Sequence, residues 1–217
     1  MADIFREVDE EVRREQLKKL WDRYSNYVIA AAVLVVAAVA AWRAYDWWEA
    51  KKAAEAGAAF ETASGLADAG KHAEAEAAFA RIATDGTASY RRLARVRAAA
   101  ELAQTDAKAA LAAYEKIAGD SAVGDVLQDL AGVRAAALLI NAGSFREAQQ
   151  KLEPLAANER VFRHTARELL VLAAWRAGDA AEAKRWSDLV MADPQTPPDT
   201  RSRVEMLIDL GAEASKS

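Results

Sequence analysis

Few side chains in this sequence have the types and spacing that catalysis or metal binding requires. The chain has no cysteine, which excludes disulfides, zinc-thiolate sites and thiol catalysis. Its two histidines, His72 and His164, stand alone in charged helical contexts without a second ligand at metal spacing, so we expect surface histidines. No GxSxG, P-loop, HExxH or GxGxxG pattern occurs. We therefore predict a protein that is not an enzyme, holds no cofactor or metal, and takes no small-molecule substrate.

Without such sites, the function must depend on the surface of the protein, and the composition indicates that helices form this surface. Hydrophobic residues make up 53% of the 217 residues, which suffices for a packed core. Alanine is common beside Leu, Glu, Lys and Arg, whereas there are only 10 Gly and 4 Pro, a composition typical of helices. The net charge of -4 is small and both signs are mixed along the chain, so nucleic acid is not an expected partner. The predicted fold is all-α.

The longest apolar run extends from Tyr27 to Trp42, sixteen residues without a charge. As a helix it covers about 24 Å, and its extension to residues 24–45 covers about 33 Å, which matches a hydrocarbon core of about 30 Å. Aromatic side chains, which favour the membrane interface, flank both ends. These predicted interface anchors are Trp21, Tyr24 and Tyr27 at one end and Trp42, Tyr45, Trp47 and Trp48 at the other.

We predict that residues 24–48 form one transmembrane anchor. The alternatives are a helix buried in a globular domain and a signal peptide cleaved near Ala38–Ala40, where small residues flank Val39. A buried helix does not need aromatic flanks, and the long acid-rich segment before the run favours an uncleaved anchor. Five basic residues near the span precede it and three follow it. This bias predicts a cytoplasmic N-terminus, and a periplasmic C-terminal domain if the membrane is a bacterial inner membrane.

Residues 1–23 form the predicted cytoplasmic segment. Ile4, Val8 and Val12 recur at helical spacing among charged residues, which indicates a short amphipathic helix. Such a helix lies on the membrane surface or receives a cytoplasmic partner, and we favour the surface helix.

Residues 49–217 carry an internal repeat. Four segments align when Ala75, Ala110, Ala148 and Ala183 are taken as equivalent, with spacings of 35, 38 and 35 residues. This period is close to the roughly 34 residues of a tetratricopeptide repeat. Three segments follow a glycine turn, at Gly70, Gly143 and Gly178. A large residue stands four positions after the small one in three segments, as Phe79, Tyr114 and Leu152, whereas the fourth has Ser187 there beside Trp186.

Partner helices are expected between these segments, near residues 50–69, 88–103, 124–141 and 160–177. Each repeat is then a helical hairpin that cannot bury its own apolar stripe, so the hairpins must stack. We predict a TPR-like α-solenoid of about four helical hairpins plus a C-terminal capping helix near 200–213. Its first helix continues from the transmembrane segment through Trp47 to Ala59. An irregular alanine-rich bundle is the alternative.

The first helix of each hairpin lines the inner wall of such a solenoid, where extended partner segments commonly bind. The repeat alignment transfers this wall to a set of positions that includes Leu130, Val133 and Leu172, of which Leu130 and Leu172 especially suit an ordinary core. The candidate partner-binding wall residues are Phe60, Arg92, Arg95, Asn141, Glu168, Trp175 and Arg176.

The N-terminal region resembles one bacterial family. The opening DIFREVDEEVRREQLKKLWDRYSNYVI, the apolar span with aromatic flanks and the degenerate helical repeats are similar to the ancillary subunit of the Sec translocon, the YfgM-like TPR proteins. The resemblance covers the whole chain in architecture and is most specific over residues 3–60. It implies a single-pass inner-membrane protein whose periplasmic domain associates with the Sec translocon and with periplasmic chaperones. The Ala- and Arg-rich composition departs from the family's better-known members and indicates a high-GC genome.

Three function classes follow. The leading hypothesis is a membrane-anchored module that links the translocon to periplasmic chaperones for exported proteins. The alternative is a membrane-tethered TPR scaffold for an envelope or cell-division complex. A hydrolase that uses scattered acidic residues is the third, and it would need a deep polar pocket with converging carboxylates.

Overall fold

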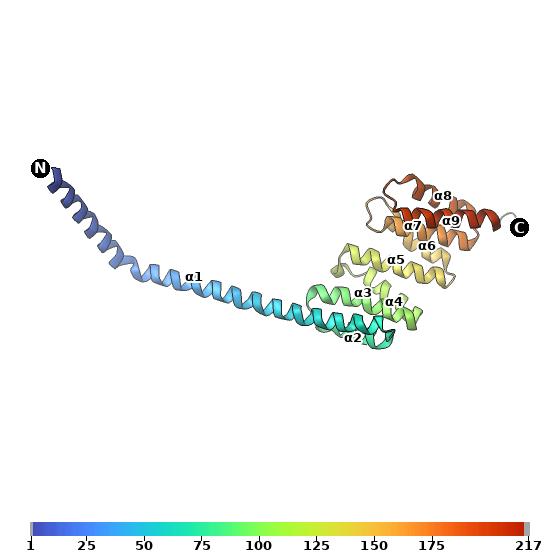
Figure 1. Cartoon of the computed structure of the whole chain (residues 1–217), viewed down its shortest axis with the longest axis horizontal. Helices are drawn as coiled ribbons and strands as arrows, with labels where there is room; N and C mark the ends of the chain where they lie inside the picture. The colour runs from blue at the N-terminus through green and yellow to red at the C-terminus, as the bar shows by residue number, and fades with distance from the viewer. Residues whose placement is uncertain (1, 215–217) are drawn as a thin grey trace. The chain divides into compact units, whose positions relative to one another are not determined.

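The computed structural model describes the backbone of residues 2–214 and the side chains of Arg14 and residues 17–210. Within residues 2–214 the chain is helical and contains no strand, which confirms the all-α prediction (Figure 1). The α-helices are α1 (Ala2–Asp68), α2 (His72–Asp85), α3 (Ala88–Thr105), α4 (Ala107–Ala118), α5 (Asp125–Asn141), α6 (Phe145–Leu152), α7 (Arg163–Ala177), α8 (Ala180–Ala192) and α9 (Pro198–Ala214). Two 3-10 helices, η1 (Ser121–Val123) and η2 (Glu153–Ala156), lie in the loops.

Helix α1 is continuous over 67 residues. No proline occurs before Pro154, and the two glycines of α1, Gly57 and Gly65, lie near its C-terminal end, so nothing interrupts the helix through the apolar run. The predicted continuation of the apolar helix through Trp47 to Ala59 is therefore confirmed. The side chains of Ile4, Val8 and Val12, on which the predicted amphipathic face depends, lie outside the described side chains.

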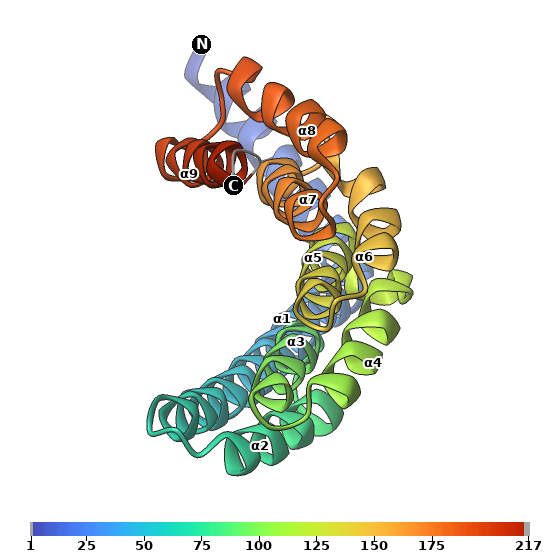
Figure 2. The ribbon, with the colours of Figure 1, turned by 90° about the vertical axis from the view of Figure 1, so that its right-hand side faces the viewer.

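The chain divides into two compact units, Met1–Lys52 and Ala53–Ser217. In the second unit, the end of α1 packs on α2 through Phe60 and Phe79, and α3 pairs with α4, α5 with α6, and α7 with α8, which gives the four predicted hairpins. Helix α9 packs against α7 and α8 as the expected cap. Figure 2 shows that α2, α4, α6 and α8 follow the outer side of the arc, and that α3, α5 and α7 follow its inner side.

The repeated small and large residues lie in the core, both within hairpins and where neighbouring hairpins stack. Ala75, Ala110 and Ala148 are completely buried, and so are Phe79 and Leu152 at the large positions. Short side chains at these points let neighbouring helices approach closely, which is why alanine recurs there. The fourth hairpin departs as its sequence does: Trp186 is buried in place of the missing large residue. The Ser187 hydroxyl donates to the Ala183 carbonyl oxygen at 2.7 Å, within its own helix.

The predicted glycine turns are present. Gly70, Gly143 and Gly178 have φ of 74°, 81° and 74°, the left-handed region that only glycine adopts without strain. The turn between α3 and α4 lacks a glycine. There the Asp106 carboxylate accepts a hydrogen bond from the Ala109 N–H at 2.9 Å and caps α4 instead.

Candidate partner-binding surface

Phe60, the first predicted wall residue, lies in the core of the first hairpin. Its ring centroid is 5.0 Å from that of Phe79 in an edge-on arrangement and 5.8 Å from that of Tyr90. The side chain is half-buried. Its main contacts are therefore those of ordinary packing between helices.

Arg95 and Glu168 each have a partner within the solenoid. Arg95 Nη1 donates to Asp120 Oδ2 at 2.6 Å. Glu168 accepts two hydrogen bonds from the Arg203 guanidinium of α9, at 2.5 and 2.8 Å. The Arg203–Glu168 pair is bidentate, which fixes the orientation of both side chains, whereas Arg95 makes a single bond; both pairs join separate elements of the solenoid.

The remaining predicted wall residues are exposed. Arg176 Nη1 donates to Asn141 Oδ1 at 3.3 Å, which joins the end of α7 to the end of α5. Trp175 precedes Arg176 and keeps 37% of its surface exposed, unusual for a large aromatic side chain. Arg92 contacts only its own helix, through the Ala88 carbonyl oxygen at 3.3 Å. These four residues, on helices of the inner side in Figure 2, form the accessible part of the predicted wall.

A second repeated feature was not predicted. A polar residue stands ten positions after the small alanine of each repeat, at or after the end of the second helix of the hairpin: Asp85, Asp120, Asn158 and Asp193. Asp120 accepts from the Ala122 N–H at 2.9 Å as well as from an arginine of the preceding helix. The arginine bond, followed by the backbone bond, lowers the pKa of the Asp120 carboxyl. Asp120 thus ties the loop after α4 to α3, the first helix of its own hairpin.

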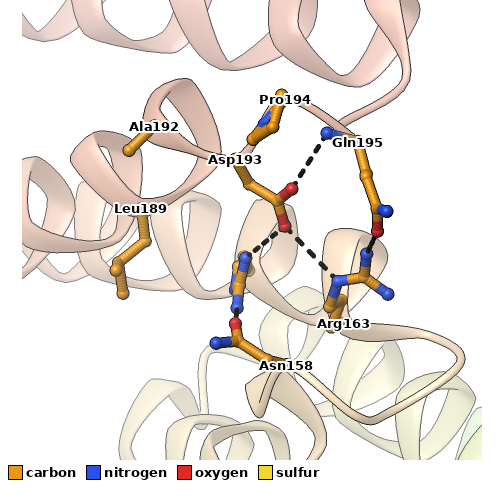
Figure 3. Close-up of a pocket in the computed structure, with 8 residues that line it drawn as sticks. Asn158, Arg163, Leu189, Ala192, Asp193, Pro194 and Gln195 are labelled. Carbon is orange, nitrogen blue, oxygen red and sulfur yellow. Dashed lines mark hydrogen bonds and ion pairs between the residues drawn. The ribbon is translucent and has the colours of Figure 1, made fainter.

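The fourth hairpin contains a larger version of this arrangement. Asp193 Oδ1 accepts from the Gln195 N–H at 2.9 Å, and Oδ2 accepts from Arg167 Nη1 at 3.0 Å and Arg163 Nε at 3.3 Å. Figure 3 shows Asp193, Arg163, Gln195 and Asn158 converging on a pocket of about 370 Å³ at the start of α7 and the end of α8. The Gln195 backbone bond and then the Arg163 bond lower the pKa of Asp193.

The prediction of surface histidines is wrong for His164, whose side chain is 15% exposed, whereas His72 keeps 35% of its side chain exposed beside a buried carboxylate. His72 Nδ1 lies 2.9 Å from an oxygen of the buried Glu101. His164 is partly buried, with Nδ1 3.3 Å from the Thr196 hydroxyl, and burial together with the neighbouring Arg163 lowers its pKa. Helix stacking places both rings between elements, which their charged sequence neighbours concealed. Among the residues that the structure describes, no group of three metal-ligating side chains occurs.

The predicted interface anchors all have exposed side chains. Tyr27 and Trp42, which bound the apolar run, are each 74% exposed. An 18-residue window of this part of α1 has a mean hydropathy of 2.1, and none of it is buried within the structure. Beyond the run, Lys52 Nζ lies 3.7 Å from the ring centroid of Trp48, a cation–π contact. By length and composition, α1 could span a membrane.

The chain belongs to the tetratricopeptide repeat-like domain family, whose pattern matches residues 18–206. The match begins before the apolar run and reaches α9, so it includes the exposed segment of α1 together with the repeats. No curated protein and no solved structure matches the chain. Domains of this class are protein-interaction modules and typically act as non-enzymatic scaffolds, which agrees with the stacked hairpins.

Proposed function

We propose that this protein is a membrane-anchored interaction module in which α1 spans a bacterial inner membrane once, N-terminus in the cytoplasm, and the solenoid binds partners in the periplasm. In its specific form, the proposal is an ancillary subunit of the Sec translocon that links it to periplasmic chaperones for exported proteins. The observation that carries it is a single helix, α1, that joins a fully exposed apolar segment to a TPR-like domain.

The exposed segment supports the anchor because its apolar side chains surround the helix. Val33, Leu34, Val35 and Val36 occupy four consecutive positions and are all at least 63% exposed. Consecutive positions point in different directions around a helix, so no single groove in a partner protein covers them all. A lipid bilayer covers every side at once, and the helix satisfies its own backbone hydrogen bonds there.

The inner wall supports partner binding through exposed side chains of the types found at interfaces. Trp175 and Arg92 are exposed on helices that line the inner side of the arc. Tryptophan and arginine are the residue types that most often dominate binding energy at protein interfaces. The membrane anchor would also hold the solenoid at high local concentration near other membrane components.

Site-specific photocrosslinking in native membranes tests this proposal. A photoreactive residue at Arg92 or Trp175 should give adducts with the translocon or with a periplasmic chaperone. The matched control is Arg81, an exposed residue of α2 on the outer side, which should give none. Adducts with division or other envelope proteins would favour the scaffold alternative. Equal crosslinking at Arg81 would contradict the inner wall as the binding surface.

A further inference from the structure

The pocket shown in Figure 3 combines a polar side and an apolar side. It lies at the edge of the solenoid, between the first turn of α7 and the end of α8. One side carries polar groups: Asn158, Arg163, Arg167, Asp193 and Gln195. The other side is apolar and consists of Leu189, Ala192 and Pro194. Leu189 remains 42% exposed, so this side is open to a ligand from solvent.

Comparison with the second hairpin identifies which charges are in excess. There, one aspartate and one arginine, Asp120 and Arg95, suffice to tie the loop to its helix. In the fourth hairpin the single carboxylate of Asp193 faces two arginines, Arg163 and Arg167. In the preceding repeat, the position equivalent to Asp120 and Asp193 is occupied by Asn158, which is neutral.

Asn158 lies beside these arginines and brings no negative charge. Arg167 Nη2 donates to its side-chain oxygen, so the amide takes the place of a carboxylate. Arg201 adds a third guanidinium close by, because its Nη2 donates to the Asp193 carbonyl oxygen at 3.3 Å. When the negative charge of Asp193 is set against the positive charges of Arg163 and Arg167, the lining of the pocket keeps a net positive charge.

The hydrogen-bonding pattern leaves donors for a ligand. A guanidinium only donates, so the atoms that Asn158 and Gln195 turn toward the arginines must be their oxygens. The NH2 group of each amide then points elsewhere. Arg163 uses Nε and Nη2 in the bonds described, which leaves its Nη1 hydrogens without a partner among the described side chains. In contrast, the Asp193 oxygens already accept three hydrogen bonds.

We propose that this pocket binds the carboxylate side chain of an acidic partner segment, with a neighbouring apolar side chain of that segment against Leu189, Ala192 and Pro194. Surplus positive charge and free donors complement a carboxylate, because charge-assisted hydrogen bonds to Arg are the strongest available to it. Asp193 is an internal residue, and both arginines donate to its side-chain carboxylate. The arginines therefore suit a side-chain carboxylate within a continuous chain. This makes the pocket a second interaction surface, separate from the inner wall.

Fluorescence anisotropy with the full chain in detergent micelles tests the proposal. The probe is a labelled peptide with a C-terminal amide that contains Leu-Glu-Leu, and its partner probe has Gln in place of Glu. We expect the Glu probe to bind at least tenfold more tightly than the Gln probe. A third probe, with Gln and a free C-terminal carboxylate, should bind as weakly as the Gln probe. Inorganic phosphate at millimolar concentration should not displace the Glu probe. Tighter binding of the third probe, or competition by phosphate, would overturn the assignment to a side-chain carboxylate.

Two variants locate the site. Arg163→Gln should abolish the preference for Glu, and the matched Arg95→Gln in the second hairpin should keep it. Asn158→Asp guards against a folding defect, because an aspartate there still accepts from Arg167 and restores the residue type of the other repeats. It should melt at the parental temperature and lose the preference for Glu. A folded Asn158→Asp protein that still prefers Glu would overturn the proposal. None of these results depends on the membrane anchor or the inner wall, so the two proposals can fail separately.

Discussion

The two parts of helix α1 show how one composition serves two environments. Between residues 17 and 48 no side chain is buried, and alanines alternate with exposed valines and leucines. Further along the same helix, Ala56 and Ala63 are 9% and 0% exposed because the first hairpin packs on them. Alanine propensity explains the helix in both places. What differs is the neighbour: the first hairpin covers the second part, whereas the side chains of residues 17–48 are not buried among the residues that the structure describes.

The largest expected effect concerns the exposed apolar segment of α1. Leu34→Arg together with Val36→Arg places two charges in the centre of the apolar segment, each at a cost of about 3 kcal/mol in a bilayer. We expect alkaline carbonate to extract the variant from membranes and to leave the parent in the pellet. Leu93→Arg, at an exposed leucine of α3, is the control and should stay in the pellet. Extraction of the parent itself would remove the case for an anchor.

A smaller effect is expected in the buried core of the repeats. Phe79 is completely buried between hairpins, so Phe79→Ala should lower the free energy of unfolding by about 3–5 kcal/mol through lost burial and a cavity. Leu34→Ala truncates a side chain that is 71% exposed and should leave the unfolding midpoint of the solenoid unchanged. Urea titration of both variants in the same micelles measures the difference. Equal losses would mean that the apolar segment packs against the repeats.

The smallest effect concerns the loop carboxylates. Asp120 has a lowered pKa, so its ion pair stabilises the fold above the ordinary carboxyl pKa of about 4 and loses that contribution as the pH falls through the lowered value. Asp120→Asn should therefore flatten the decline in melting temperature below about pH 4. The matched control is Asp85→Asn, at the equivalent position of the first hairpin, where no arginine partner occurs among the described side chains. A control as flat as Asp120→Asn would contradict this assignment.

Periodicity in the sequence was sufficient to predict the hairpins. The spacing of Ala75, Ala110, Ala148 and Ala183 placed each second helix, and the glycines placed three of the turns. These features are local, because helix propensity and turn conformation depend on residues within one or two turns of each other. The wall residues were harder to place. Arg95 has a loop partner 25 positions away, and no short-range pattern reveals such a partner.

The sequence by itself determined a chain of helices, an apolar segment with aromatic flanks, and hairpins that must stack to bury their stripes. Only the tertiary structure decided which charged side chains meet. Arg163 and Arg167 are 30 and 26 residues from Asp193, and they meet it because the start of α7 stacks beside the end of α8. Secondary structure follows from short-range preferences, whereas the charge balance of a pocket depends on how distant elements pack.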